Sequence, residues 1–185
     1  FESRTTHQPH IFDRGVTVMA TRYSKMLLTA AIAFFASLVA FGNLTDYGSN
    51  FAFVQHVLRM DTIFPTATIQ YRAIESTFAH HALYGLIILF ELATAVLCWV
   101  GAWRMFRYRH APAAQFNRMK RWAIIGLTLG FLLWQVGFMS IGGEWFGMWM
   151  SEQWNGVPSA FRFFITIGVV LIYVSLRDAE LHESA

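Results

Sequence analysis

Residues 79–103, AHHALYGLIILFELATAVLCWVGAW, form a long apolar run with a single acidic side chain, Glu91. A helix needs about 20 such residues to cross a hydrocarbon core of about 30 Å. Comparable runs cover residues 26–44, 122–141 and 160–176. Lipid offers the backbone no hydrogen-bond partner, so runs this apolar are expected to be helical. The sequence therefore predicts an all-α membrane protein, an antiparallel bundle of four transmembrane helices.

The composition favours the same class. Only 14% of the 185 residues are charged and 56% are hydrophobic, whereas a soluble domain carries about a quarter charged residues. There is no basic tract, so we expect no nucleic-acid partner. The single cysteine, Cys98, cannot form an internal disulfide. We expect one domain over residues 22–178, a polar extension over residues 1–21 outside the fold, and a cytoplasmic tail over residues 179–185.

The basic residues predict the orientation of the bundle. They precede the first run and gather between the second and third runs, at Arg22, Lys25, Arg104, Arg107, Arg109, Arg118, Lys120 and Arg121. Loops rich in arginine and lysine remain on the cytoplasmic side of a membrane. We therefore expect a multi-pass protein of the bacterial inner membrane with both termini in the cytoplasm.

The first of the two opposite loops is expected to hold a short interfacial helix. Phe51, Val54, Val57 and Leu58 recur at helical spacing, and Ser49 or Asn50 precedes them as a possible N-cap. Such a helix would lie on the membrane surface or cover the end of the bundle.

The second opposite loop is dense in large apolar side chains. Trp145 and Trp149 are four residues apart, so they would share one face of a helix. This loop either anchors the chain at the membrane interface or docks another membrane protein. The predicted partner-binding residues are Trp145, Phe146, Trp149 and Trp154. At the start of the last run, Arg162 is expected to form an ion pair with Glu144.

Two groups of motifs resemble a known family. The first comprises NLTDYGSNF at residues 43–51, FVQHVL at 53–58 and MDT at 60–62. The second comprises GGEWF at residues 142–146, WNG at 154–156 and AFRF at 160–163. Together they resemble a bacterial family of predicted small integral membrane proteins, a domain of unknown function with four transmembrane helices. The resemblance covers about residues 25–178 and implies a topology but no activity.

Glu91 is the clearest candidate site residue, because an ionisable group inside a span is costly. Counted along the helices, Gln135 reaches a similar depth, and a bond between the two side chains would satisfy both. His80, Tyr84 and Glu91 form one stripe along the second run, and His81 lies beside it. These residues, with Gln135, either bind a cofactor such as a quinone headgroup, conduct protons, or form a polar seam between helices.

We expect no metal and no resident cofactor. A zinc or copper site needs three or four ligands, and no ligand spacing typical of one is present. A bis-histidine haem needs histidines on facing helices, and no other run contains one. Gly126 and Gly130 form a GxxxG pattern, which permits close contact within the bundle or between subunits.

The inventory of reactive groups does not favour an enzyme. No nucleophile has an adjacent base, and no phosphate-binding loop is present. The leading hypothesis is a non-enzymatic membrane protein that acts through contacts, as an accessory subunit of a larger complex or a homo-oligomeric scaffold. Its partners would be lipids and another membrane protein or itself. The alternatives are a redox- or quinone-linked protein that uses the His80, His81, Tyr84 and Glu91 stripe, and an oligomeric channel or proton pathway centred on Glu91.

Overall fold

The computed structural model describes residues 11–181, and every regular element within them is a helix. Four segments are long and apolar enough to cross a membrane. They are α1 (Ile11–Thr45), α3 (Thr77–Arg107), the continuous helix formed by α5 (Arg121–Leu132) and η2 (Leu133–Trp145), and α6 (Val157–Ser175). The all-α class and the four spans predicted from the sequence are thereby confirmed.

The long helices extend beyond the predicted apolar runs. Helix α1 begins at Ile11, so part of the segment expected to lie outside the fold is helical, and residues 1–10 fall outside the described part. Helix α3 continues to Arg107. Hydropathy marks only the stretch that matches the hydrocarbon core, whereas a helix can continue into the headgroup region, where polar side chains are accommodated.

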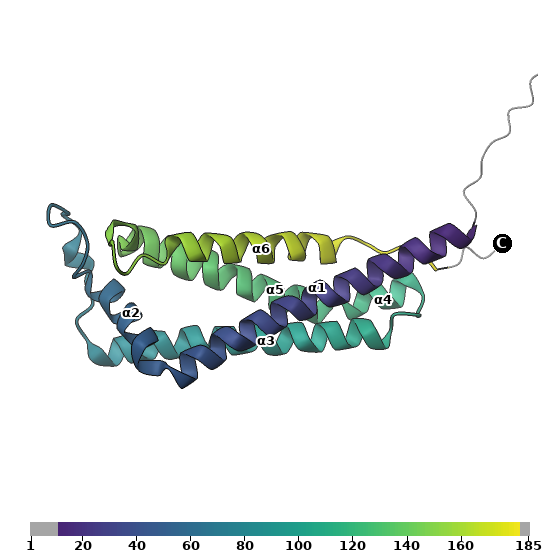
Figure 1. Ribbon diagram of the computed structural model, residues 1–185, viewed down its shortest axis with the longest axis horizontal. Coiled ribbons are helices and arrows are strands. Elements are labelled where there is room, and N and C mark those ends of the chain that lie inside the picture. Colours follow the sequence, from purple (N-terminus) through teal and green to yellow (C-terminus); the bar gives the residue numbers. More distant parts are fainter. Residues whose placement is uncertain (1–10, 182–185) are drawn as a thin grey trace, which may run out of the picture.

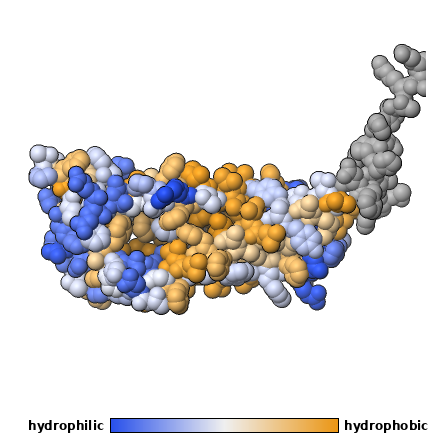
Figure 2. Space-filling view, viewed as in Figure 1, coloured by the Kyte–Doolittle hydropathy of each residue, from blue (hydrophilic) through white to orange (hydrophobic). Residues whose placement is uncertain are grey.

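Figure 1 shows the helices along one long axis, with short elements at both ends. One end, called here the α2 end, carries α2 (Tyr47–Arg59), η1 (Gln70–Arg72) and η3 (Met148–Met150). The other, the α4 end, carries α4 (Ala113–Met119) and the segment after α6. Figure 2 shows hydrophobic residues over the middle of the bundle and hydrophilic residues gathered at the α2 end.

Helix α1 crosses α3 diagonally and ends short of the first turn of α3 at the α2 end (Figure 1). Helix α2 follows directly and covers the part of α3 that α1 does not reach. There, Val54 and Leu58 of α2 are buried in a cluster with Tyr84 and Ile88 of α3. The predicted helix in this loop is therefore present. It starts earlier than predicted, with Asp46 as N-cap, so Ser49 and Asn50 lie in its first turn and do not cap it.

Small residues bring α3 and α5 together toward the α4 end. A Cβ atom on Gly126 would lie 2.8 Å from the Cys98 Sγ atom and 2.9 Å from the Cys98 backbone nitrogen. A Cβ atom on Gly130 would lie 2.9 Å from the Thr94 Cγ2 atom. The GxxxG pattern thus serves a contact within the bundle, because only glycine allows the two helices to approach this closely.

Beyond Leu132 the third span changes from α-helix to the wider π-helix η2. Two hydrogen bonds show the five-residue spacing: the Ser140 hydroxyl donates to the Gln135 carbonyl at 3.1 Å, and the Phe146 N–H donates to the Ile141 carbonyl at 3.0 Å. A π-helix is rare and is often found at functional sites.

Candidate functional site

A hollow with a volume of about 390 Å³ lies between α2, α3 and η2. Its walls are almost entirely aliphatic and aromatic, and we call it the apolar pocket. The residues that line it are Phe53, Val54, Val57, Leu58, Leu83, Leu86, Ile87, Phe90, Leu132, Leu133, Val136, Gly137, Phe138, Ile141, Gly142, Phe146 and Met148. A pocket of this size and composition is typical of binding sites for small apolar molecules.

The apolar pocket opens sideways from the bundle. Its rim includes Leu86 on α3 and Ile141 on η2, which are 47% and 48% exposed. Buried Val54, Leu58 and Phe146 close it toward the α2 end and the core. Both rim residues belong to membrane-spanning segments, so the opening faces lipid tails.

None of the five side chains predicted to bind a cofactor lines the apolar pocket. His80 is buried and its Nε2 atom lies 2.7 Å from the Ile74 carbonyl oxygen. The His81 ring stacks on Phe51 with 4.0 Å between centroids, and its Nδ1 atom lies 2.8 Å from the Tyr47 hydroxyl. Each histidine therefore has one hydrogen-bond partner within the protein, whereas the His80 Nδ1 atom has none within the described part.

Glu91 hydrogen-bonds to Asn43, and the predicted bond to Gln135 is wrong. The Asn43 Nδ2 atom donates to Glu91 Oε2 at 2.7 Å, and the Tyr84 hydroxyl donates to the Asn43 carbonyl at 3.0 Å. The other carboxyl oxygen, Oε1, has no hydrogen-bond partner within the described part, so Gln135 does not bond to it. Trp134, one position earlier, lies in the core and lines a small cavity together with Glu91.

Asn43 is the site residue that the sequence analysis missed. It lies two positions before the end of α1, where a polar side chain is expected to reach the membrane surface. Because α1 ends short of α3, this end lies beside the interior of α3 instead. The signal was present in the sequence, since Asn43 opens the first family motif and is the only amide in or next to the first apolar run.

The predicted partner-binding residues differ in exposure. Trp145 and Trp149 are 52% and 46% exposed, but Phe146 is buried and lines the apolar pocket. The Trp154 ring stacks on His56 with 4.6 Å between centroids. Gly147 interrupts the expected helix because its φ angle of 66° lies in the left-handed region, which favours glycine. Trp145 and Trp149 therefore belong to two different elements.

The predicted ion pair between Glu144 and Arg162 is not formed. The Arg162 guanidinium donates to the Ser159 hydroxyl one turn earlier, at 3.0 Å. At the same end, Arg59 pairs with Glu75 at 3.1 Å, and both side chains are exposed. Side chains that reach water at a helix end gain little from a specific ion pair, so sequence proximity does not decide the partner.

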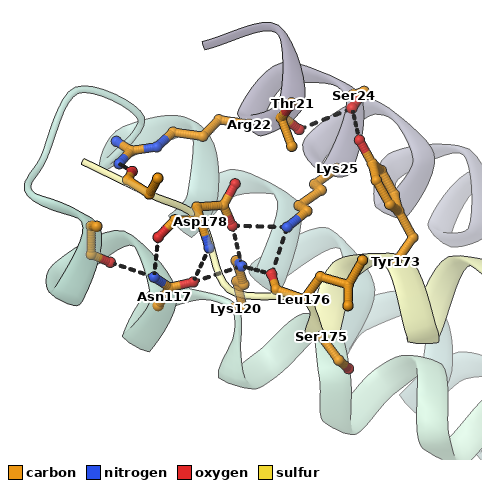
Figure 3. A network of polar contacts seen from close by, with 12 residues as sticks. Thr21, Arg22, Ser24, Lys25, Asn117, Lys120, Tyr173, Ser175, Leu176 and Asp178 are labelled. Carbon is orange, nitrogen blue, oxygen red and sulfur yellow. Dashed lines mark hydrogen bonds and ion pairs between the residues drawn. The ribbon is translucent and has the colours of Figure 1, made fainter. Parts of the chain in front are cut away.

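A second polar cluster lies at the α4 end and joins α1, α4 and the segment after α6 (Figure 3). Lys25 and Lys120 both contact the Oδ2 atom of Asp178, with the Lys25 Nζ atom 2.9 Å away. Both lysines also donate to the Leu176 carbonyl oxygen. The three charged side chains are at most 2% exposed. We call this group, with Arg22, the tail cluster.

Arg22 completes the tail cluster from α1. Its guanidinium donates to the carbonyl oxygens of Arg109, Ala111 and Ala179, at 2.8, 2.7 and 3.2 Å. The Glu180 carboxylate accepts the backbone N–H of Ala113 at 2.9 Å. The start of the expected tail, up to Leu181, is thus part of the packed structure, and the remaining residues lie outside the described part.

Within residues 11–181, no three histidine, cysteine, aspartate or glutamate side chains come close enough to hold a metal ion. No curated protein and no solved structure matches the chain. The match that exists is to a family, and it covers the four spans and both sets of loop motifs, over residues 21–177. The chain belongs to this family, described as predicted small integral membrane protein (DUF2165).

Proposed function

We propose that this protein binds a lipid-like molecule through the apolar pocket and acts by such contacts, without catalysing a reaction. The observation that carries the proposal is a pocket of about 390 Å³ between two spans and α2, with apolar walls and a lateral opening. A soluble ligand would meet no polar group there that could orient it. An acyl or isoprenoid chain, already dissolved in the membrane, matches both the walls and the entry side.

The pocket favours an aliphatic chain over a quinone ring. The candidate residues for a quinone headgroup, His80, Tyr84 and Glu91, are buried and lie outside the pocket walls. A ligand in the apolar pocket does not reach these polar groups, so it can gain no hydrogen bond from them. A chain-like molecule needs only apolar area, which Leu83, Ile87 and their neighbours provide.

The distribution of charge supports a bacterial inner-membrane location with the α4 end in the cytoplasm. Basic residues gather at that end, in α4 and the adjoining ends of α1, α3 and α5. In this orientation the apolar pocket lies in the outer half of the membrane. The molecule bound there would come from the outer leaflet.

The first test is native mass spectrometry of the full chain released gently from its own membrane. We expect a bound mass in the range of a lipid, and an organic extract identifies its class. Val57→Trp adds a large ring to the pocket wall and should remove the bound mass. Val169→Trp is the matched control, because Val169 on α6 is 63% exposed and does not line the pocket.

A photoactivatable phospholipid in vesicles then locates the site. Cross-links should fall on residues 83–90 and 132–142, and they should disappear in Val57→Trp. Equal retention of the bound mass by both tryptophan variants, or cross-links spread evenly around the bundle, would contradict the proposal. A helical circular-dichroism spectrum for each variant shows that the fold is kept.

A second candidate function, docking of another membrane protein or a second copy, rests on one observation. Trp145 and Trp149 remain half exposed at the α2 end, and aromatic side chains of this kind mark contact surfaces. We expect the double change to alanine to reduce association by at least tenfold, because such anchors contribute about 2 kcal/mol or more. Cross-linking in membranes measures this association. Phe161→Ala, at an exposed position on α6, is the control.

A further inference from the structure

Glu91 lies beside a small cavity between α1, α3, η2 and α6. Its carboxyl is 2% exposed, and while Oε2 accepts from Asn43, Oε1 has no hydrogen-bond partner within the described part. The Thr94 hydroxyl, one turn along α3, is buried and also without a partner there. Both side chains line the same cavity of about 10 Å³. Two buried polar atoms without partners therefore share one space.

The size and chemistry of this cavity fit a single water molecule. One water needs roughly 10–15 Å³ and two to four polar partners. The other walls are apolar, including Ile32 of α1, Leu133 of η2 and Ile167 of α6. A divalent cation would need about six oxygen ligands, whereas the lining side chains carry three oxygens, one of which already accepts from Asn43. The cavity is therefore suited to water and unsuited to such an ion.

No positive charge balances Glu91. Helix α1 contributes the Asn43 amide, η2 contributes Trp134 and α6 contributes Ile167. On α3 itself, Tyr84 donates its hydroxyl proton to Asn43. None of these groups is a cation, and Glu91 takes part in no ion pair with any described residue. An unpaired carboxylate in so apolar a place is strongly disfavoured, and protonation removes the cost.

We infer that Glu91 is a proton-binding site in the middle of the membrane, a neutral carboxylic acid whose Oε1–H donates to a water held by Thr94. Asn43 determines which oxygen carries the proton. Its amide donates to Oε2, which therefore acts as the carbonyl oxygen, and Oε1 is left as the hydroxyl. The site is separate from the apolar pocket, which neither Glu91 nor Thr94 lines. The two proposals can therefore fail independently.

Infrared spectroscopy of the full chain in lipid vesicles at neutral pH tests this site. Exposed carboxylates are ionised there, so a carbonyl band of a protonated acid reports a buried one. We expect that band in the wild-type protein and its loss in Glu91→Gln. Thr94→Val removes a water partner and should shift the band, whereas Thr94→Ser should leave it in place. Thr166→Val is the control, because the Thr166 hydroxyl donates to the Arg162 backbone carbonyl on α6 and Thr166 does not line the cavity.

Three results would overturn the inference. If the wild-type protein shows no carbonyl band of a protonated acid, Glu91 is ionised. A band that does not respond to Thr94→Val excludes the shared water. A band that disappears when sodium is added shows a cation site in place of a proton site. If Glu91→Gln does not fold, the two Thr94 variants still decide, because they leave the carboxyl untouched.

Discussion

Asp178 is the residue on which the α4 end depends most. Among the side chains that the structure describes, it is the only acidic one that forms an ion pair with Lys25 and Lys120, and all three are buried. Buried ion pairs are costly to assemble, but removal of one partner leaves an uncompensated charge, and that costs about 3–5 kcal/mol. Here one carboxylate serves two cations, so its loss affects both.

We therefore expect Asp178→Asn to lower the free energy of unfolding by about 3–5 kcal/mol, as measured by denaturant titration in detergent micelles. Glu75→Gln is the matched control. It breaks the exposed pair with Arg59, and such pairs contribute about 1 kcal/mol or less. If both variants unfold at the same denaturant concentration, the tail cluster is not what stabilises this end.

At the scale of single residues, the sequence predicted depth better than partners. Glu91 lies in the interior as expected, because depth follows from counting along a helix. Its partner Asn43 was missed, because the choice depends on where α1 ends relative to α3. The tail cluster was missed for a related reason: Lys25 and Asp178 are 153 residues apart, and each alone resembles an ordinary charged flank of a span.

Among the helices, the contact between α3 and α5 is the least tolerant of change. A methyl group on Gly126 would meet both the side chain and the backbone of Cys98, at 2.8 and 2.9 Å. The backbone at Cys98 cannot move aside unless the whole of α3 moves with it. Gly137 in η2 is different, because a Cβ atom there would meet only Leu133 Cδ1, at 3.7 Å, which is an ordinary contact.

We expect Gly126→Ala to destabilise the protein by about 1–3 kcal/mol, because overpacking forces the two spans apart. Gly137→Ala should be neutral or stabilising by up to about 1 kcal/mol, since alanine favours a helix over glycine. Thermal unfolding followed by circular dichroism compares the two variants. Equal melting temperatures would mean that the spans are not in close contact at Gly126.

The existence of each long helix could be predicted, because about 20 apolar residues in succession have one solution in lipid. The short helix α2 followed from the spacing of Val54 and Leu58. The π-helix η2 could not be predicted, because its residues are as apolar as those of an α-helix and the altered hydrogen bonds leave no periodic signature.

For the whole molecule, the orientation in the membrane remains a prediction from the positive-inside rule, and the sequence makes it easy to test. Cys98 is the only cysteine and is fully buried, so it should give little background in labelling experiments. Glu152 at the α2 end and Gln115 at the α4 end are both exposed. Each can carry a new thiol without loss of packing.

We expect a membrane-impermeant maleimide to label Glu152→Cys in intact cells and to label Gln115→Cys only after the membrane is opened. This result would place the apolar pocket in the outer half of the bilayer. The reverse pattern would place the α4 end outside, against the distribution of arginine and lysine.

The tail cluster also has a consequence for the order of assembly during synthesis. Lys25 belongs to α1, which leaves the ribosome before the other described spans, but its anionic partner Asp178 follows α6. Until α6 is inserted, Lys25 lacks both Asp178 and the Leu176 carbonyl, and it can remain hydrated at the membrane border, where long cationic side chains are stable. Lys25 would thus first orient the nascent chain and later join α1 to the segment after α6, so this end of the bundle is completed only when α6 arrives.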